Sequence, residues 1–229
     1  GIIRLLVLVL CATGISVGAH GQDTHRRVAL VVGNASYRNV ERLANPGNDA
    51  KLIADTLRKS GFTLIGDGAQ YNLDKPAFDR LVADFGKKIQ GADVALFYYA
   101  GHGMEIDGTN YIIPVDATLE RDIDAFDEAI PLDRLLAVIE PAKRLRLVIL
   151  DACRDNPFAK SMKRTIGARA IGRGLAKVEP VNPNTMVAFA AKAGSTASDG
   201  DSRNSPYTTA LVKYIATPGL DLRKAFGFV

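Results

Sequence analysis

Cysteine and histidine, the usual ligands of zinc and, for cysteine, the source of disulfides, are scarce in this sequence. Its 229 residues include two cysteines, Cys11 and Cys153, and three histidines, none of which forms a spaced pair with a nearby cysteine. A zinc site is therefore not supported. We expect Cys11 to leave with an N-terminal leader, which excludes an internal disulfide and marks Cys153 as a candidate reactive thiol.

Phosphate-binding motifs are missing as well. Gly33-Asn34 follows a predicted strand, yet neither GxGxxG nor GxxxxGK[ST] occurs in the chain, so nucleotide binding is not indicated. No internal repeat is visible. What is present is a hydrophobic content of 47% over 229 residues, which suits one domain of ordinary size with a substantial core.

The first residues have the form of a secretory signal peptide. Residues 2–19 hold a basic residue, an apolar run over 5–12 and small residues up to Ala19, in the order that such signals share. A membrane anchor is the alternative, but the apolar run is too short to span a bilayer and is followed closely by Gly14. We therefore expect residues 1–19 to be removed and the mature protein, without a membrane span, to be exported to the periplasm or secreted.

Alternating strand and helix patterns predict an α/β fold. Short apolar runs predict strands at 28–32, 62–65, 93–100, 111–115, 145–151 and 185–190, and amphipathic helices are predicted to begin at Asn45, Asp74 and Ser205. Strands that alternate with helices in this way form a mostly parallel sheet that is covered on both faces.

Positive charge is concentrated in one segment after Cys153. Residues 154–177 hold seven Lys or Arg against one Asp, a net charge of +6 in a chain whose total is +4. Glycines and a scarcity of large apolar residues favour a mobile, exposed linker over 160–177. Basic runs can also bind nucleic acid, but these 18 residues contain no aromatic side chain for base stacking, so we expect no nucleic-acid partner.

Two reactive side chains follow separate predicted strands. His102, between two glycines, comes after the run 93–100, and Cys153 comes after 145–151. If both strands are parallel members of one sheet, the two residues emerge at the same edge, where open α/β sheets bind ligands. A buried structural cysteine is the alternative, because free Cys is among the most buried residue types.

Six segments of the chain resemble the caspase-like cysteine peptidases. They are RVALVVGN (27–34), NPGNDA (45–50), FYYAGHG (97–103), NYIIPVD (110–116), LDACRDNP (150–157) and SPYTTAL (205–211). Cys153 also follows His102 by 51 residues, close to the interval of about 50 in caspases. The resemblance is to peptidase family C14, and specifically to its bacterial metacaspase-like branch, the orthocaspases. It implies the caspase-hemoglobinase fold, with a mostly parallel central sheet and helices on both faces.

The resemblance also implies a function. It makes His102 and Cys153 the catalytic dyad of a cysteine endopeptidase, with the backbone N–H groups of Gly103 and Cys153 as the oxyanion hole. Glycine suits that position because a backbone without Cβ can approach a substrate closely. A catalytically silent caspase-fold binding or signalling module is the alternative, against which the presence of both dyad residues argues. A flavodoxin-like or receiver-like regulatory domain is a more distant one.

Asp49 and Asp151 match the carboxylate positions with which metacaspases bind arginine or lysine. The resemblance therefore implies peptide or protein substrates that are cut after a basic residue. Each position has a simpler explanation too, since Asp49 falls in the first turn of a predicted helix and Asp151 ends a strand. Residues 154–156 and Ala100 depart from the usual metacaspase pattern, which leaves the finer subsites open.

By the same resemblance, residues 26–229 comprise a large-subunit-like region (26–159), the basic linker (160–177) and a small-subunit-like region (178–229). A helix-like pattern still runs at Val229, so we expect a truncated C-terminus. Calcium is the one cofactor that the family suggests, because parts of it depend on calcium. The acidic segment 120–128 lacks EF-hand spacing and is better interpreted as a solvated loop, so no metal site is assigned and no cofactor is required.

The linker holds candidate substrates for the enzyme itself. A peptidase with basic specificity meets Lys163, Arg164, Arg169 and Arg173 on its own chain, and tethering raises their effective concentration. We expect self-cleavage after one of these residues, with the fragments held together because the strand at 185–190 stays buried in the shared sheet. A solvated loop that is never cut is the alternative.

Overall fold

The computed structural model describes residues 25–153, 156–159, 161–163, 165, 175–176, 178–179, 182–190 and 203–215. The expected signal peptide (1–19) and three of the expected cleavage residues, Arg164, Arg169 and Arg173, lie outside these residues.

A parallel sheet forms the centre of the described structure, as predicted. β1 (Arg27–Gly33), β2 (Phe62–Leu64), β3 (Gln70–Tyr71), β4 (Val94–Ile106), β7 (Leu145–Cys153) and β8 (Thr185–Phe189) run parallel to their neighbours. β1 and β7 flank β4, and β8 pairs with the other edge of β7. The carboxyl ends of β1, β7 and β8 therefore meet along one edge of the sheet, beside the middle of β4.

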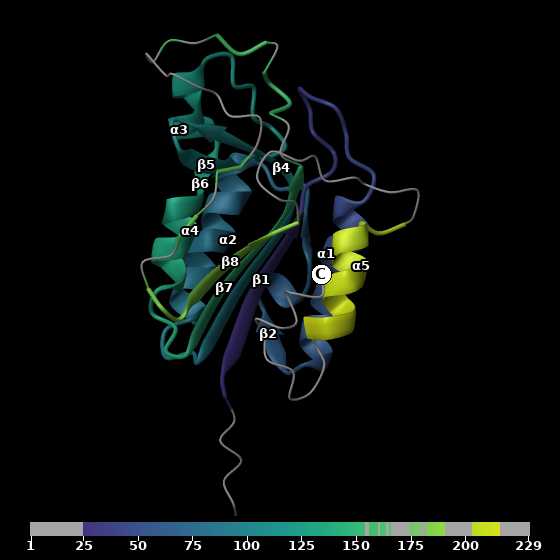
Figure 1. Ribbon diagram of the computed structural model, residues 1–229, viewed down its shortest axis with the longest axis vertical. Coiled ribbons are helices and arrows are strands. Elements are labelled where there is room, and N and C mark those ends of the chain that lie inside the picture. Colours follow the sequence, from purple (N-terminus) through teal and green to yellow (C-terminus); the bar gives the residue numbers. More distant parts are fainter. Residues whose placement is uncertain are drawn as a thin grey trace, which may run out of the picture.

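Helices cover both faces of this sheet (Figure 1). α1 (Pro46–Lys59) and α5 (Pro206–Ile215) lie side by side on one face, and α2 (Lys75–Lys88) and α4 (Leu132–Ile139) lie on the other. α4 was not predicted from the sequence. The architecture is otherwise the expected one, an α/β fold with both faces of a mostly parallel sheet covered.

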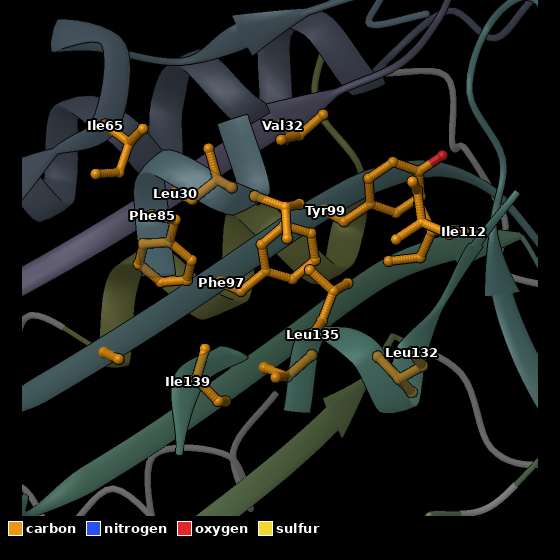
Figure 2. Packing of buried hydrophobic residues seen from close by; sticks show 14 of the residues in the cluster. Leu30, Val32, Ile65, Phe85, Phe97, Tyr99, Ile112, Leu132, Leu135 and Ile139 are labelled. Carbon is orange, nitrogen blue, oxygen red and sulfur yellow. The ribbon is translucent and has the colours of Figure 1, made fainter. Parts of the chain in front are cut away.

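Alternation along the strands produces two separate cores. Phe97 and Tyr99 of β4 pack with Phe85 of α2 and Leu135 of α4 on one face (Figure 2). Leu96, Tyr98 and Ala100 of the same strand belong to the second cluster, with apolar residues of α1 and α5. Because successive strand residues point to opposite faces, a strand buried on both sides needs the unbroken apolar sequence seen from Val94 to Ala100.

β4 is longer than predicted, because it does not end at Ala100. It continues through His102 to Ile106 and pairs there with β5 (Thr109–Ile112), which in turn pairs with β6 (Ile130–Pro131), both antiparallel. β5 replaces the strand expected at 111–115. His102 therefore lies inside a strand, at the point where β4 leaves the parallel sheet and enters a hairpin.

The acidic segment 120–128 is largely exposed, as expected, but it is not a loop. It forms η2 (Asp122–Asp124) and α3 (Ala125–Glu128), and Asp122 is only 1% exposed. The Asp122 carboxylate accepts hydrogen bonds from Thr165, including its backbone N–H at 2.9 Å. A buried carboxylate needs such donors in place of water, and here the linker supplies them.

Both ends of the basic linker are anchored, so the prediction of a linker exposed throughout was wrong. At its start, the N–H of Lys163 donates to Glu120 (2.7 Å) and its carbonyl accepts from Asp122 (3.1 Å). Near its end, Leu175 is buried in the core, and Asn110 forms two hydrogen bonds with the backbone of Ala176, at 2.6 and 2.9 Å. The nine residues 166–174 between these anchors lie outside the described part of the chain.

Candidate active site

The register of the sheet aligns the predicted catalytic residues. His102 of β4 and Cys153 of β7 are paired residues of neighbouring parallel strands, one row beyond the pair of Gly101 with Ala152 and two rows beyond the pair of Ala100 with Asp151. Cys153 is the last residue of β7, whereas the sequence analysis placed it just past the strand. The fold thus brings both residues, which are 51 positions apart in the sequence, to the same edge of the sheet.

The His102 ring is buried and oriented by its neighbours. The residue is 6% exposed, its Nε2 lies 3.0 Å from the carbonyl oxygen of Glu41, and its ring centroid lies 4.5 Å from that of Tyr37. A carbonyl oxygen can only accept, so this contact assigns the proton of the neutral ring to Nε2. Nδ1 is then the unprotonated nitrogen of the neutral ring.

Two tyrosines hold the backbone at His102. The N–H of His102 donates to the Tyr37 hydroxyl at 2.7 Å, which lies 2.9 Å from the Tyr99 hydroxyl. Tyr99 in turn donates to the carbonyl oxygens of His102 (2.9 Å) and Ile113 (3.0 Å). Burial raises the pKa of Tyr99 well above its usual range, which keeps this donor protonated.

Glycine at position 101 makes this tyrosine network possible. A Cβ there would lie 2.5 Å from the Tyr99 hydroxyl oxygen and 2.6 Å from that of Tyr37, and φ of Gly101 is +153°. Both distances are far inside van der Waals contact, so any side chain would displace the hydroxyls that hold His102.

Gly103, predicted to contribute to the oxyanion hole, has a close neighbour that the sequence analysis did not anticipate. A Cβ at this position would lie 3.1 Å from a methyl carbon of Leu175, at the end of the linker, and 3.4 Å from the carbonyl oxygen of Tyr111. In this structure, the missing side chain of Gly103 therefore makes room for packing of the chain itself.

Asp49 and Asp151, the predicted specificity residues, come together around the start of α5. Oδ1 of Asp49 accepts from the Asn204 side chain (2.8 Å) and from the N–H of Ser205 (3.0 Å). Oδ2 of Asp151 accepts from the hydroxyl of Ser205 at 2.6 Å. The two carboxylates, which come from α1 and β7, are thus joined through one serine.

Two further hydroxyls hold Asp151. Thr208 Oγ1 donates to Oδ2 at 2.8 Å, and the Tyr98 hydroxyl lies 3.3 Å from Oδ2 and 2.6 Å from Thr208 Oγ1. Burial also raises the pKa of Tyr98 well above its usual range. These neutral donors allow a charged carboxylate to remain partly enclosed by protein.

Asp49 is only 2% exposed, and its burial raises the pKa of its carboxyl from 3.8 to about 6. The nearby charge of Asp151 adds to this rise, while the hydrogen bonds from Asn204 and Ser205 oppose it. Two carboxylates that repel each other, one buried and the other partly buried, favour the approach of a cation.

Sequence reasoning missed four residues of this cluster: Tyr98, Asn204, Ser205 and Thr208. Ser205 was predicted as a helix cap, and it is one, since its Oγ accepts the N–H of Thr208 at 3.0 Å. Its second role toward Asp151 left no signal in the sequence. For Tyr98 a signal existed. Alternation along the strands puts Tyr98 of β4 and Asp151 of the adjacent strand β7 on the same face of the sheet.

Comparison with known proteins identifies the fold and the family together. A model of the caspase domain matches residues 26–229. The chain belongs to the caspase-domain family. Members of this family are cysteine peptidases that act on proteins, which agrees with the predicted family and leaves its bacterial branch as a prediction.

The individual relatives of this caspase domain share less than a third of its residues over the aligned regions. The human mucosa-associated lymphoid tissue lymphoma translocation protein 1 and its mouse homologue are each 29% identical over 131 residues, 56% of this chain and 15% of theirs. The crystal structure of the Drosophila initiator caspase Dronc superposes with a TM-score of 0.56 and 14% identity, over 88% of this chain and 70% of that one. This likeness confirms the caspase fold.

Two further searches, for a membrane-spanning helix and for a metal site, cover only the described residues. None of the helices described here combines the length and apolar composition needed to cross a bilayer. Within the same residues, no three His, Cys, Asp or Glu side chains cluster as a metal site, and the buried Asp122 is occupied by Thr165.

Proposed function

We propose that this caspase domain is a cysteine endopeptidase that uses His102 and Cys153 to cut after arginine or lysine. The observation that carries the proposal is the acidic cluster of Asp49 and Asp151, which lies at the same sheet edge as the paired His102 and Cys153. A peptidase needs its nucleophile beside the pocket that holds the residue before the scissile bond.

The chemistry follows from the two side chains. The Cys153 thiolate adds to the carbonyl carbon of the scissile bond, and backbone N–H groups at Gly103 and Cys153 stabilise the oxyanion. Protonated His102 gives a proton to the amine as the C–N bond breaks. Water then adds to the thioester, the C–S bond breaks, and the proton from water returns to His102.

The position of His102 suits this exchange. With Nε2–H held by the Glu41 carbonyl at 3.0 Å, Nδ1 is the ring atom that gains and loses the proton. Tyr37 holds the backbone N–H of His102 and Tyr99 holds its carbonyl oxygen. The imidazole is therefore already oriented before the reaction begins.

The acidic cluster explains the proposed specificity. A guanidinium or ammonium group entering between Asp49 and Asp151 relieves their mutual repulsion, whereas an aspartate side chain would add a third negative charge. Substrates with Arg or Lys before the scissile bond should therefore be cut, and substrates with Asp at that position should not.

Turnover of fluorogenic peptides that differ at this one position tests the proposal. We expect hydrolysis of the Arg and Lys peptides, no hydrolysis of the Asp peptide, and no activity in Cys153→Ala. Efficient cleavage after Asp would refute the acidic pocket. A folded protein that cleaves none of the peptides and is not labelled by an arginine-directed thiol-reactive probe would instead be a silent binding module.

A further inference from the structure

Ser205 contacts both acidic residues of the proposed pocket. Its N–H donates to Asp49 at 3.0 Å and its hydroxyl donates to Asp151 at 2.6 Å, although Asp49 lies 156 positions earlier in the chain. Ser205 itself is buried, with 6% of its surface exposed. Neither carboxylate can shift without changing its bond to this serine.

The same hydroxyl caps α5, and this determines the direction of its proton. Ser205 Oγ accepts the N–H of Thr208 at 3.0 Å, which occupies a lone pair, so its single proton is directed to Asp151. The ten-residue helix α5 also turns its positive end toward the carboxylates. The cap thus works as an oriented donor as well as a helix stop.

Thr208 and Tyr98 reinforce the arrangement from a second side. Thr208 uses its one hydroxyl proton on Asp151, so the 2.6 Å contact with Tyr98 is a bond that Tyr98 donates. Both residues are fully buried. Asp151 is therefore held by a chain of donors that begins in β4 and passes through α5.

We propose that Ser205 is a positioning residue that holds the two carboxylates at a fixed separation and orientation and thereby favours arginine over lysine. This inference rests on the proposed basic specificity. Arginine presents a rigid planar fork that binds two oxygens in fixed directions, whereas the lysine ammonium is a compact point charge that tolerates movement of its partners. Carboxylates in fixed positions therefore bind the arginine fork more tightly than lysine, and carboxylates that can move lose this preference.

The arrangement also joins the two sides of the linker. Asp49 and Asp151 precede the linker, and Ser205 and Thr208 follow it. The pocket is therefore a composite of both regions, and a chain cut within the linker keeps its specificity as long as α5 stays on the sheet.

The test compares Ser205→Ala with Ser205→Thr, which keeps the hydroxyl, and with Thr208→Val, which removes a donor to Asp151 but leaves the cap. Asp74→Ala is the matched control, because Asp74 caps α2 by accepting the N–H of Ala77 at 2.9 Å, away from the acidic cluster. Each variant is assayed with peptides carrying Arg, Lys or norleucine before the scissile bond.

We expect Ser205→Ala to raise KM for the Arg peptide about tenfold, as for a lost hydrogen bond to a charged group, with kcat changed less than about twofold. KM for the Lys peptide should rise less, so the preference for Arg over Lys falls. Thr208→Val should act in the same direction, and Ser205→Thr should restore the preference. Asp74→Ala should lower the melting temperature without changing the ratio.

Binding separates this inference from the proposed function. Calorimetric titration of Cys153→Ala with a non-reacting arginine-amide peptide needs no turnover, and adding Ser205→Ala should weaken Kd about tenfold. An unchanged Kd, or equal losses for Arg, Lys and norleucine peptides, would overturn the role of Ser205. If the unmutated protein binds the arginine peptide but hydrolyses none, the proposed peptidase activity is refuted while arginine binding by the acidic cluster is supported.

Discussion

The phenol of Tyr37 accepts the backbone N–H of His102 at 2.7 Å, and the two rings lie with their centroids 4.5 Å apart. Tyr37 lies in the loop after β1, and His102 lies inside β4, 65 positions later. This loop residue therefore contributes to the position of the proposed general acid although it takes no part in the chemistry.

Replacing Tyr37 by Phe should keep the ring contact and remove the acceptor. The buried N–H of His102 would then lack its partner, which costs about 1–3 kcal/mol of unfolding free energy. We expect kcat to fall about tenfold, because the imidazole loses its fixed orientation. Denaturant unfolding and peptide hydrolysis measure the two effects. Tyr71→Phe, at a residue that is 45% exposed, should leave both unchanged.

Cys153→Ala and His102→Ala should each lower kcat/KM at least about 10³-fold while the protein remains folded. Groups that act as a unit fail together, so the double variant should be no worse than either single one. Hydrolysis rates of an Arg peptide and far-UV circular dichroism provide the measurements. Turnover by a folded Cys153→Ala protein would contradict the mechanism.

Recognition of arginine should depend on pH through Asp49. Its pKa of about 6 means that the pocket loses one negative charge as the pH falls through that value. KM for an Arg peptide should then rise, while KM for a norleucine peptide stays level. Asp49→Asn should abolish this dependence and raise KM for Arg at pH 8. A pH-independent ratio of the two KM values in the unmutated protein would contradict the assignment.

The same shift has a consequence for stability, with the opposite sign from an ordinary ion pair. Because the folded-state pKa of Asp49 is raised from 3.8 to about 6, the folded protein binds the extra proton between these values. Its contribution is present below pH 3.8 and is lost as the pH rises to about 6, amounting to at most about 3 kcal/mol. Asp49→Asn should remove this loss, and denaturant unfolding at pH 4, 5 and 7 measures it.

Self-cleavage should occur after Arg169 or Arg173 in preference to Lys163 and Arg164. The backbone of Lys163 is paired with Glu120 and Asp122, and the N–H of Thr165 is held by the Asp122 carboxylate at 2.9 Å. A protease must take up the bonds around the cut as an extended segment, and these contacts have to break first. Intact-mass analysis should show a cut within 166–174, and Cys153→Ala should remain whole.

Releasing the anchor provides a sharper form of this experiment. Asp122→Ala removes the acceptor of Thr165 but keeps the backbone pairing of Lys163 with Glu120 and Asp122, so it should open the bond after Arg164 to cutting and leave the bond after Lys163 protected. Asp127→Ala, at an exposed neighbouring carboxylate, should leave the pattern of the unmutated protein. The same fragments in both variants would mean that the Asp122 contacts do not protect this part of the linker.

The sequence by itself determined the α/β class, the places along the chain where most of the parallel strands lie, and the two candidate catalytic positions. These features are local: a strand buried on both faces needs a continuous apolar run, and residues that follow parallel strands must meet at one edge. The runs before His102 and Cys153 predicted two buried strands, and a common edge for the two residues followed if both strands were parallel. That the two strands are neighbours and pair His102 with Cys153 came only from the structure. The family motifs cover the same stretches.

Tertiary structure alone decided how the site is held. Ser205 meets Asp49 across 156 positions, Tyr37 meets His102 across 65, and Thr165 meets Asp122 across 43. In each case a buried polar group needs a partner, and that requirement is visible in the sequence only as a serine, a tyrosine or an aspartate of unknown surroundings. Which residue meets the need depends on how the helices and loops pack over the sheet edge, and no local pattern encodes that.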